Sequence, residues 1–108
     1  MKSKWQKFVE GEIALRVERD DYWEFAVNCE NCNIMYRGGG VPVLKMNPFH
    51  IYPNKKYIIF YCVNPGYTAP WCKLVYTDIA GLKQKYGDIP VKNYLVFELI
   101  TNFEEEEE

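Results

Sequence analysis

The sequence predicts a strand-rich α+β domain, with about six mostly antiparallel strands and one short helix before the last strand. Apolar and polar residues alternate over residues 12–18, 22–28 and 92–101, which is typical of half-buried strands. Residues 57–63 form an unbroken apolar run, whereas residues 78–86 have the apolar spacing of an amphipathic helix. The simplest architecture is therefore a curled sheet or a small barrel, with the helix packed on one face or end.

Length and composition predict a single domain over residues 1–103, followed by an acidic tail. A chain of 108 residues is close to the commonest domain size, and 48% hydrophobic residues exclude a wholly disordered protein. The net charge of −2 conceals five consecutive glutamates at the C-terminal end. We expect this run, residues 104–108, to be disordered. The rest of the chain is weakly basic and does not by itself require a nucleic-acid partner.

The first part of the chain is expected to form strands. Residues 12–18 and 22–28 are predicted to pair as a β-hairpin around a polar turn. Residues 41–46 form a short strand that Pro42 favours at a sheet edge, and residues 47–56 are predicted to be an irregular loop. The alternating apolar side chains of the hairpin are Ile13, Leu15, Val17, Trp23, Phe25 and Val27.

The second part contains the strongest strand and the helix. The apolar run 57–63 suits a central strand covered on both faces, and a loop at 64–70 leads to a strand at 71–76. Thr77 is expected to cap the helix that follows. Three residues at helical spacing give that helix its apolar face, and a glycine in the left-handed conformation is expected to end it. These residues are Ile79, Leu82, Tyr86 and Gly87.

No segment of the sequence predicts a membrane span or a targeting signal. The longest apolar run has seven residues, whereas a membrane helix needs about 20. We therefore expect a protein of the cytoplasm, in the host cell if it is viral.

The four cysteines have the most distinctive chemistry in the sequence. Cys29 and Cys32 have the spacing of a zinc knuckle, and Asn33 can adopt the left-handed conformation needed after the second cysteine. This short segment resembles one knuckle of a zinc ribbon. Cys62 and Cys72 are too far apart to form the second knuckle, but they can supply two ligands from neighbouring strands. One structural zinc bound by these four cysteines is therefore one expectation.

Two alternatives to zinc stay open. Reduced structural thiols are favoured by the apolar strand around Cys62, because a free cysteine behaves as a small buried hydrophobe. A disulfide or a redox pair is the remaining choice. His50, the single histidine, could replace Cys62 as a ligand, although a loop histidine is more often solvated.

The sequence gives little support for catalysis. One histidine leaves few acid–base groups besides carboxylates, and no nucleophile–histidine arrangement can be placed in context. We therefore expect neither enzyme activity nor catalytic residues. A small hydrolase that uses carboxylates of the strands is a third hypothesis.

The leading hypothesis is a small non-enzymatic module that binds another protein, as a monomer or a homodimer. Small size, few catalytic groups and aromatic-rich loops beside an acidic tail motivate it. This profile is similar to that of small inhibitors encoded by phages or mobile elements, including anti-defence and toxin-immunity proteins. Residues 82–91 resemble a helix-to-strand passage of small phage accessory proteins. The alternative is a zinc-stabilised module that binds nucleic acid.

The residues expected to contact a partner lie in loops and in the tail. Aromatic side chains on loops held by a rigid scaffold are typical hot spots, and a run of glutamates can bind a basic groove. The predicted contact residues are Phe49, His50, Tyr52, Tyr67, Trp71, Glu104, Glu105, Glu106, Glu107 and Glu108.

Overall fold

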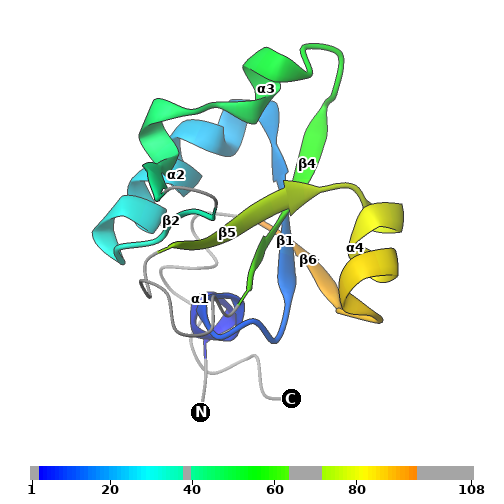
Figure 1. Ribbon diagram of the computed structural model, residues 1–108. Helices are drawn as coiled ribbons and strands as arrows, with labels where there is room; N and C mark the ends of the chain where they lie inside the picture. Colours follow the sequence, from blue (N-terminus) through cyan, green and yellow to red (C-terminus); the bar gives the residue numbers. More distant parts are fainter. Residues whose placement is uncertain (1–2, 38–39, 64–71, 95–108) are drawn as a thin grey trace.

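A computed structural model describes residues 3–37, 40–63 and 72–94, with Cys72 described only through its backbone. These residues form one open, mixed six-stranded sheet with several short helices (Figure 1). The strand-rich α+β class is thus confirmed, and within the described residues the sheet does not close into a barrel. The predicted loop at 64–70, Trp71, the predicted end of the last strand and the acidic tail lie outside the described residues.

The strands are ordered β3-β2-β5-β4-β1-β6. The antiparallel pairs are β1–β4, β4–β5 and β2–β3, whereas β2–β5 and β1–β6 are parallel. β3 occupies an edge, as Pro42 predicts, although the rest of that predicted strand is a 3-10 helix. The elements are α1 (Lys4–Val9), β1 (Ala14–Glu18), η1 (Arg19–Asp21), α2 (Tyr22–Asn31), β2 (Met35–Tyr36), β3 (Val41–Pro42), η2 (Val43–Lys45), α3 (Pro48–Ile51), β4 (Tyr57–Cys62), β5 (Cys72–Thr77), α4 (Ile79–Tyr86) and β6 (Val91–Asn93).

The central position of β4 is confirmed. Leu15 of β1 pairs with Phe60 on one side, and Tyr76 of β5 pairs with Phe60 on the other. Ile59 and Phe60 point to opposite faces of the sheet, and both are fully buried. An unbroken apolar sequence is what a strand covered on both faces requires.

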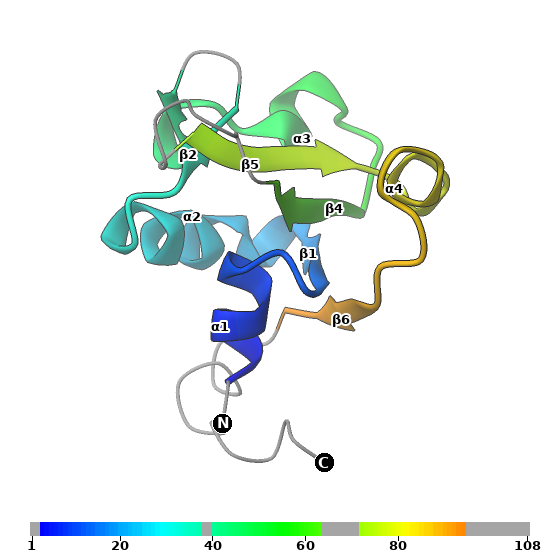
Figure 2. The ribbon, with the colours of Figure 1, turned by 60° about the horizontal axis from the view of Figure 1, so that its bottom comes forward.

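Helices cover the two faces of the sheet. α1, α2 and α3 contribute Phe8, Phe25 and Phe49 to the main core on one face. On the other face, Leu82 of α4 packs against Ile59 in a smaller core. Figures 1 and 2 agree that α2 and α4 lie on opposite sides of the sheet.

The prediction of a β-hairpin over residues 12–28 is wrong in its second half, because residues 22–31 form the helix α2. Trp23, which the alternation placed in the core, is 67% exposed. Phe25 instead packs on Phe60 of β4, with ring centroids 4.7 Å apart. The buried residues have the i, i+3, i+4, i+7 spacing of one helical face. They are Tyr22, Phe25, Ala26 and Cys29.

Two short helices, α1 and α3, have no counterpart in the prediction. They contain six and four residues, too few for a periodic signal. Each begins with a side-chain cap: Ser3 Oγ accepts from the Gln6 N–H, and Asn47 Oδ1 accepts from the Phe49 N–H. Phe8 and Phe49 anchor the two helices in the core. Burial of one aromatic ring therefore stabilises each of these two helices, which are too short to be stable through helix propensity alone.

The helix predicted at 78–86 is confirmed, with two differences in detail. Its cap is Asp78 instead of Thr77, since Asp78 Oδ1 accepts a hydrogen bond from a backbone N–H of the first turn at 2.7 Å. Leu82 is buried as expected, but Ile79 is 51% exposed. Gly87 ends the helix with the predicted positive φ, 88°.

We predict that Asp78→Ala lowers the free energy of unfolding by about 1 kcal/mol, because it removes the only side-chain cap of α4. Asp88→Ala is the matched control. Its carboxylate is 89% exposed and lies 3.9 Å from Lys83 Nζ, so its loss should change little. Urea denaturation of both variants measures the difference, and equal effects would contradict the capping role.

Candidate functional site

The predicted contact residues that the structure describes do not all lie on the surface. Phe49 is only 3% exposed and packs edge-on against Tyr22 in the core, so its ring is not available to a partner. His50 is exposed beside it. Tyr52, which is 45% exposed, lines a surface hollow. Tyr67, Trp71 and the five glutamates of the tail lie outside the described residues.

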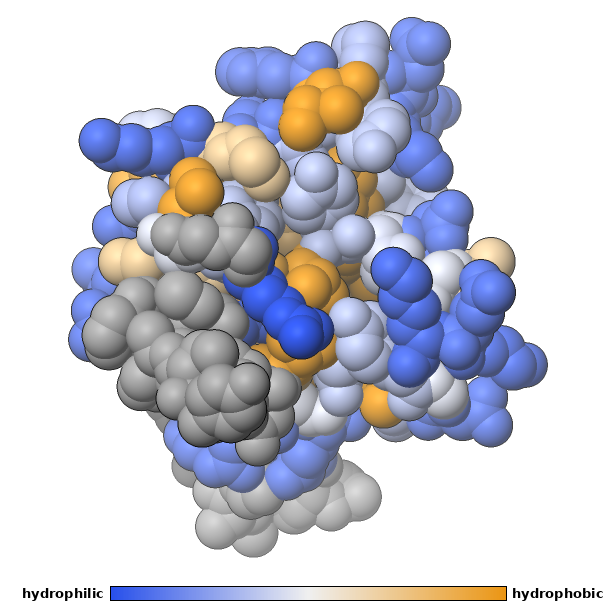
Figure 3. Space-filling view, viewed as in Figure 1, coloured by the Kyte–Doolittle hydropathy of each residue, from blue (hydrophilic) through white to orange (hydrophobic). Residues whose placement is uncertain are grey.

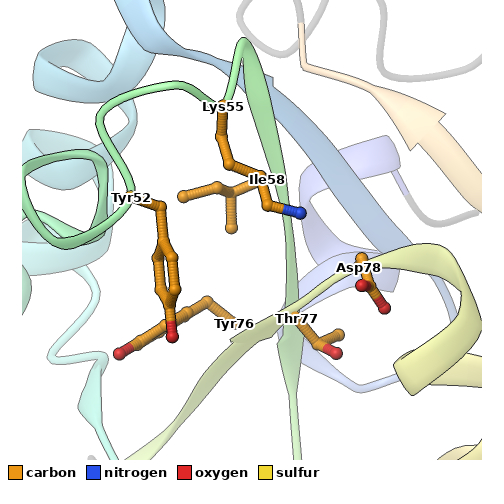
Figure 4. A pocket seen from close by; sticks show the side chains of 6 residues that line it. All are labelled: Tyr52, Lys55, Ile58, Tyr76, Thr77 and Asp78. Carbon is orange, nitrogen blue, oxygen red and sulfur yellow. The ribbon is translucent and has the colours of Figure 1, made fainter.

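The hollow beside Tyr52 lies where the α3–β4 connection faces the end of β5 (Figure 4). It has a volume of about 250 Å³. The rings of Tyr52 and Tyr76 meet edge to face with centroids 6.4 Å apart, and the side chain of Lys55 extends over the hollow toward Thr77. The lining residues are Tyr52, Lys55, Ile58, Tyr76, Thr77 and Asp78.

A second hollow, of about 340 Å³, shares Tyr76 and Thr77 with the first. Its lining mixes apolar and polar side chains, and it includes the cations Arg37 and Lys85. Figure 3 shows hydrophobic atoms between polar ones near the middle of the face on which β5 lies. The remaining lining residues are Tyr36, Val41, Met46, Leu74, Val75 and Tyr86. The two hollows together are called the β5 groove below.

The β5 groove runs beside a strand edge that β2 covers only in part. β2 has two residues, and the last described bond on this edge joins the Arg37 N–H to the Leu74 C=O at 2.8 Å. In a strand, the N–H and C=O groups of successive residues point to opposite sides. Those of Tyr76, two residues after Leu74, therefore point to the same side of β5 as those of Leu74. The N–H and C=O of Tyr76 therefore point away from β4, into the groove.

A buried tyrosine network holds the wall of the groove. The Tyr22 hydroxyl lies 2.6 Å from the Tyr36 hydroxyl, 2.7 Å from the Val43 carbonyl and 2.9 Å from the Met46 carbonyl. Carbonyls only accept, so the single Tyr22 proton goes to them and Tyr36 donates to Tyr22. Burial raises the pKa of Tyr22 and of Tyr36, and both remain neutral hydroxyls at ordinary pH. This network joins α2 to β2 and to the segment after β3.

The charges along the groove have mostly one sign. Arg37, Lys55 and Lys85 are exposed lining residues, whereas Asp78 is the single acid among the described lining residues. One carboxylate oxygen of Asp78 already caps α4. The described lining residues therefore present an excess of positive charge next to apolar side chains, a combination that attracts an anionic partner.

Sequence reasoning found Tyr52 but missed the rest of this groove. Tyr36, Arg37, Tyr76 and Lys85 come from three parts of the chain, and only the strand order brings them together. No local motif marks them. The one available signal was the clustering of tyrosines, which also suits a buried core.

The cysteines lie where α2 packs on the sheet. Cys29 and Cys62 are buried, whereas Cys32 is exposed and its Sγ accepts a hydrogen bond from Trp5 Nε1 at 3.3 Å. Burial raises the pKa of the Cys62 thiol to about 12, although Lys73 opposes the shift. The pKa of Cys29 is also raised well above its ordinary value by burial. Asn33 has the predicted left-handed conformation, with φ of 60°.

The four-cysteine zinc site stays a prediction. Among the described side chains, no three His, Cys, Asp or Glu residues are grouped so that they could hold a metal ion. Cys72, one of the four, is described only through its backbone, which pairs with Met35. Native mass spectra before and after chelation distinguish a bound zinc from free thiols.

No helix in the described ranges is long and apolar enough to cross a membrane. Comparison with models of known protein families found no match, and neither a search of curated proteins nor a search of solved structures returned a significant one. The arguments that follow therefore rest on the chemistry of the groove.

We predict that Tyr22→Phe lowers the free energy of unfolding by about 1–3 kcal/mol, because the Tyr36 hydroxyl and the Val43 carbonyl lose their buried partner. Tyr52→Phe, which removes an exposed hydroxyl, should cost less than about 0.5 kcal/mol. In the Tyr22→Phe background, Tyr36→Phe should add little further loss. Strictly additive effects in this double-mutant cycle would show that the two hydroxyls are not coupled.

We also predict that the protein loses stability in alkaline solution. The pKa of Cys62, about 12 in the folded chain, exceeds the value of about 8.5 for an unfolded cysteine. Its contribution is complete below pH 8.5 and is lost as the pH rises toward 12, at about 1.4 kcal/mol per pH unit. Urea midpoints at pH 7, 9 and 10.5 measure this loss, and Cys62→Ala should reduce the slope. A flat profile to pH 10.5 would contradict the buried thiols.

Proposed function

We propose that this chain is a small non-enzymatic module that binds another protein through the β5 groove. The single observation that carries the proposal is the strand edge at Tyr76, whose N–H and C=O point into a groove lined in part by apolar side chains. Backbone groups on an open edge and apolar pockets beside them are what strand-adding peptide-binding domains use. A role as an inhibitor of the anti-defence or immunity type, acting in the cytoplasm, is part of the proposal and rests on the sequence profile.

The exposed large hydrophobic residues support the same surface. Tyr52, 45% exposed, lines the groove, and the exposed side chains of Ile51 and Ile79 belong to the chain neighbours of the lining residues Tyr52 and Asp78. Large apolar side chains exposed beside a hollow are typical of interaction sites. Trp23, the most exposed of the four, lies on α2 and lines neither hollow.

We predict that Tyr52→Ala weakens binding of the protein partner by about 1–3 kcal/mol, because it removes an aromatic anchor at the edge of the groove. Trp23→Ala is the matched control, since it removes an even more exposed aromatic ring elsewhere. Both variants should keep their unfolding temperature. Partners captured by the wild-type chain from its source cells are purified, and their affinity for the three proteins is then compared.

The opposite pattern, with binding lost in Trp23→Ala and kept in Tyr52→Ala, would place the contact on α2 and overturn the groove assignment. Trp71→Ala and deletion of residues 104–108 test the two predicted contact regions that lie outside the described residues. Salt-dependent binding of a single-stranded oligonucleotide, with no protein partner, would favour the nucleic-acid alternative.

A further inference from the structure

We infer that the β5 groove takes an acidic, extended peptide segment, which adds to the sheet as a further strand beside Tyr76. The inference rests on the proposed function and names the chemistry of the partner. Three observations carry it: a short stretch of β5 edge to which no described strand pairs, two hollows that share Tyr76 and Thr77 there, and three cations that line them.

The first step concerns the backbone. The edge of β5 is paired with β2 as far as Leu74, and Val75–Thr77 continue beyond the last residue of β2. A segment that lies in line with β2 meets the N–H and C=O of Tyr76 and can form one pair of ladder hydrogen bonds there. On the opposite edge of β5, Tyr76 and Thr77 are paired with β4. The groove thus offers a short strand edge for pairing, and the opposite edge of the same strand is held in place by β4.

The second step concerns side chains. Successive residues of an added strand point to opposite faces of the sheet. Those on one face would lie over Met46 and Tyr76, which pack on the main core, and beside the exposed ring of Tyr52. Those on the other face would lie over Val75 and Tyr86. Both sets meet half-buried apolar surface, so the segment gains hydrophobic contacts on both faces.

The third step concerns charge. Arg37 and Lys85 line one hollow, and Lys55 lines the other. All three side chains are exposed, so their charges remain available to a ligand. Asp78, the one acid that the structure describes in the groove, has an oxygen engaged by the backbone of α4. An acidic segment is therefore favoured over a neutral or basic one, most strongly at low ionic strength.

The test uses labelled eight-residue peptides in which valine alternates with glutamate, glutamine or lysine, titrated against the full chain by fluorescence polarisation. We expect the glutamate peptide to bind at least about tenfold more tightly than the lysine peptide, with the glutamine peptide between them. Raising the salt concentration from 50 to 500 mM should remove most of this preference.

Two charge reversals locate the site. Arg37→Glu should weaken binding of the glutamate peptide by about tenfold and remove most of the difference among the three peptides, because the lining charges then cancel. Lys92→Glu is the matched control, because Lys92 is exposed on β6 at the opposite edge of the sheet. It should leave all three affinities unchanged. Equal effects of the two reversals would show that only net charge matters, which overturns the site.

The strand geometry has its own readout. N-methylation of a peptide residue removes one backbone N–H, and in an added strand only every second N–H faces the sheet. Methylation of central residues of one parity should abolish binding, while methylation of the other parity should be tolerated. Equal tolerance at both parities would overturn strand addition.

The failure of this inference and that of the proposed function can be separated. If no peptide binds while the protein partner still requires Tyr52, strand addition is wrong and the protein-binding module stands. If the peptides bind equally well at low salt, the acidic preference is wrong. If oligo(dT) binds, loses affinity in Arg37→Glu, and no peptide binds, both fail and the groove is a surface for nucleic acid.

Discussion

The packing of one aromatic helix face on one central strand organises this molecule. Tyr22 and Phe25 of α2 lie 5.9 and 4.7 Å, centroid to centroid, from the ring of Phe60 in β4. Phe60 in turn is paired through its backbone with β1 and β5. Aromatic pairs at these distances add to the hydrophobic burial that dominates a small core. The position of α2 on the sheet follows from this contact.

The hydroxyl of Tyr22 links the packing of the core to the position of β2. Its ring is fixed by Phe25 and Phe60, so its oxygen can meet Tyr36 and the Val43 carbonyl only in one arrangement. A buried hydroxyl without partners is costly, and the chain around β2 therefore takes the position that satisfies it. β2 then covers β5 only as far as Leu74. In this account the open edge of β5 is a consequence of how the core is packed.

An open strand edge beside an apolar hollow is a hazard that folded proteins commonly limit with charge. Here the cations Arg37, Lys55 and Lys85 lie along the groove. The same charges that discourage pairing between copies of the chain favour a segment of opposite charge. One set of residues can thus oppose self-association and select a partner.

The sequence predicted those elements of the fold whose pattern is complete within a few neighbouring residues. The strand β4 and the helix α4 were predicted because an unbroken apolar run and a 3.6-residue period are complete within about nine residues. The edge position of β3 was predicted from Pro42 alone. In each case the decisive residues are neighbours in the chain.

The errors arise where distant residues decide. Residues 22–28 are compatible with alternation and with a helical face, and only contact with Phe60 favours the helix. Phe49 is indistinguishable in sequence from an exposed loop aromatic until the core around Tyr22 is known. The groove was not predictable for the same reason, because Tyr36, Tyr76 and Lys85 meet only through the strand order.

The most direct test of this account is amide hydrogen exchange of Val75, Tyr76 and Thr77 in the free protein, measured residue by residue by NMR. The N–H groups of Val75 and Thr77 point toward β4 and that of Tyr76 points into the groove. The account predicts slow exchange at Val75 and Thr77 and exchange at least about a hundredfold faster at Tyr76. Equal protection at all three residues would contradict it, because the edge of β5 would then be covered and no groove would be open to a partner.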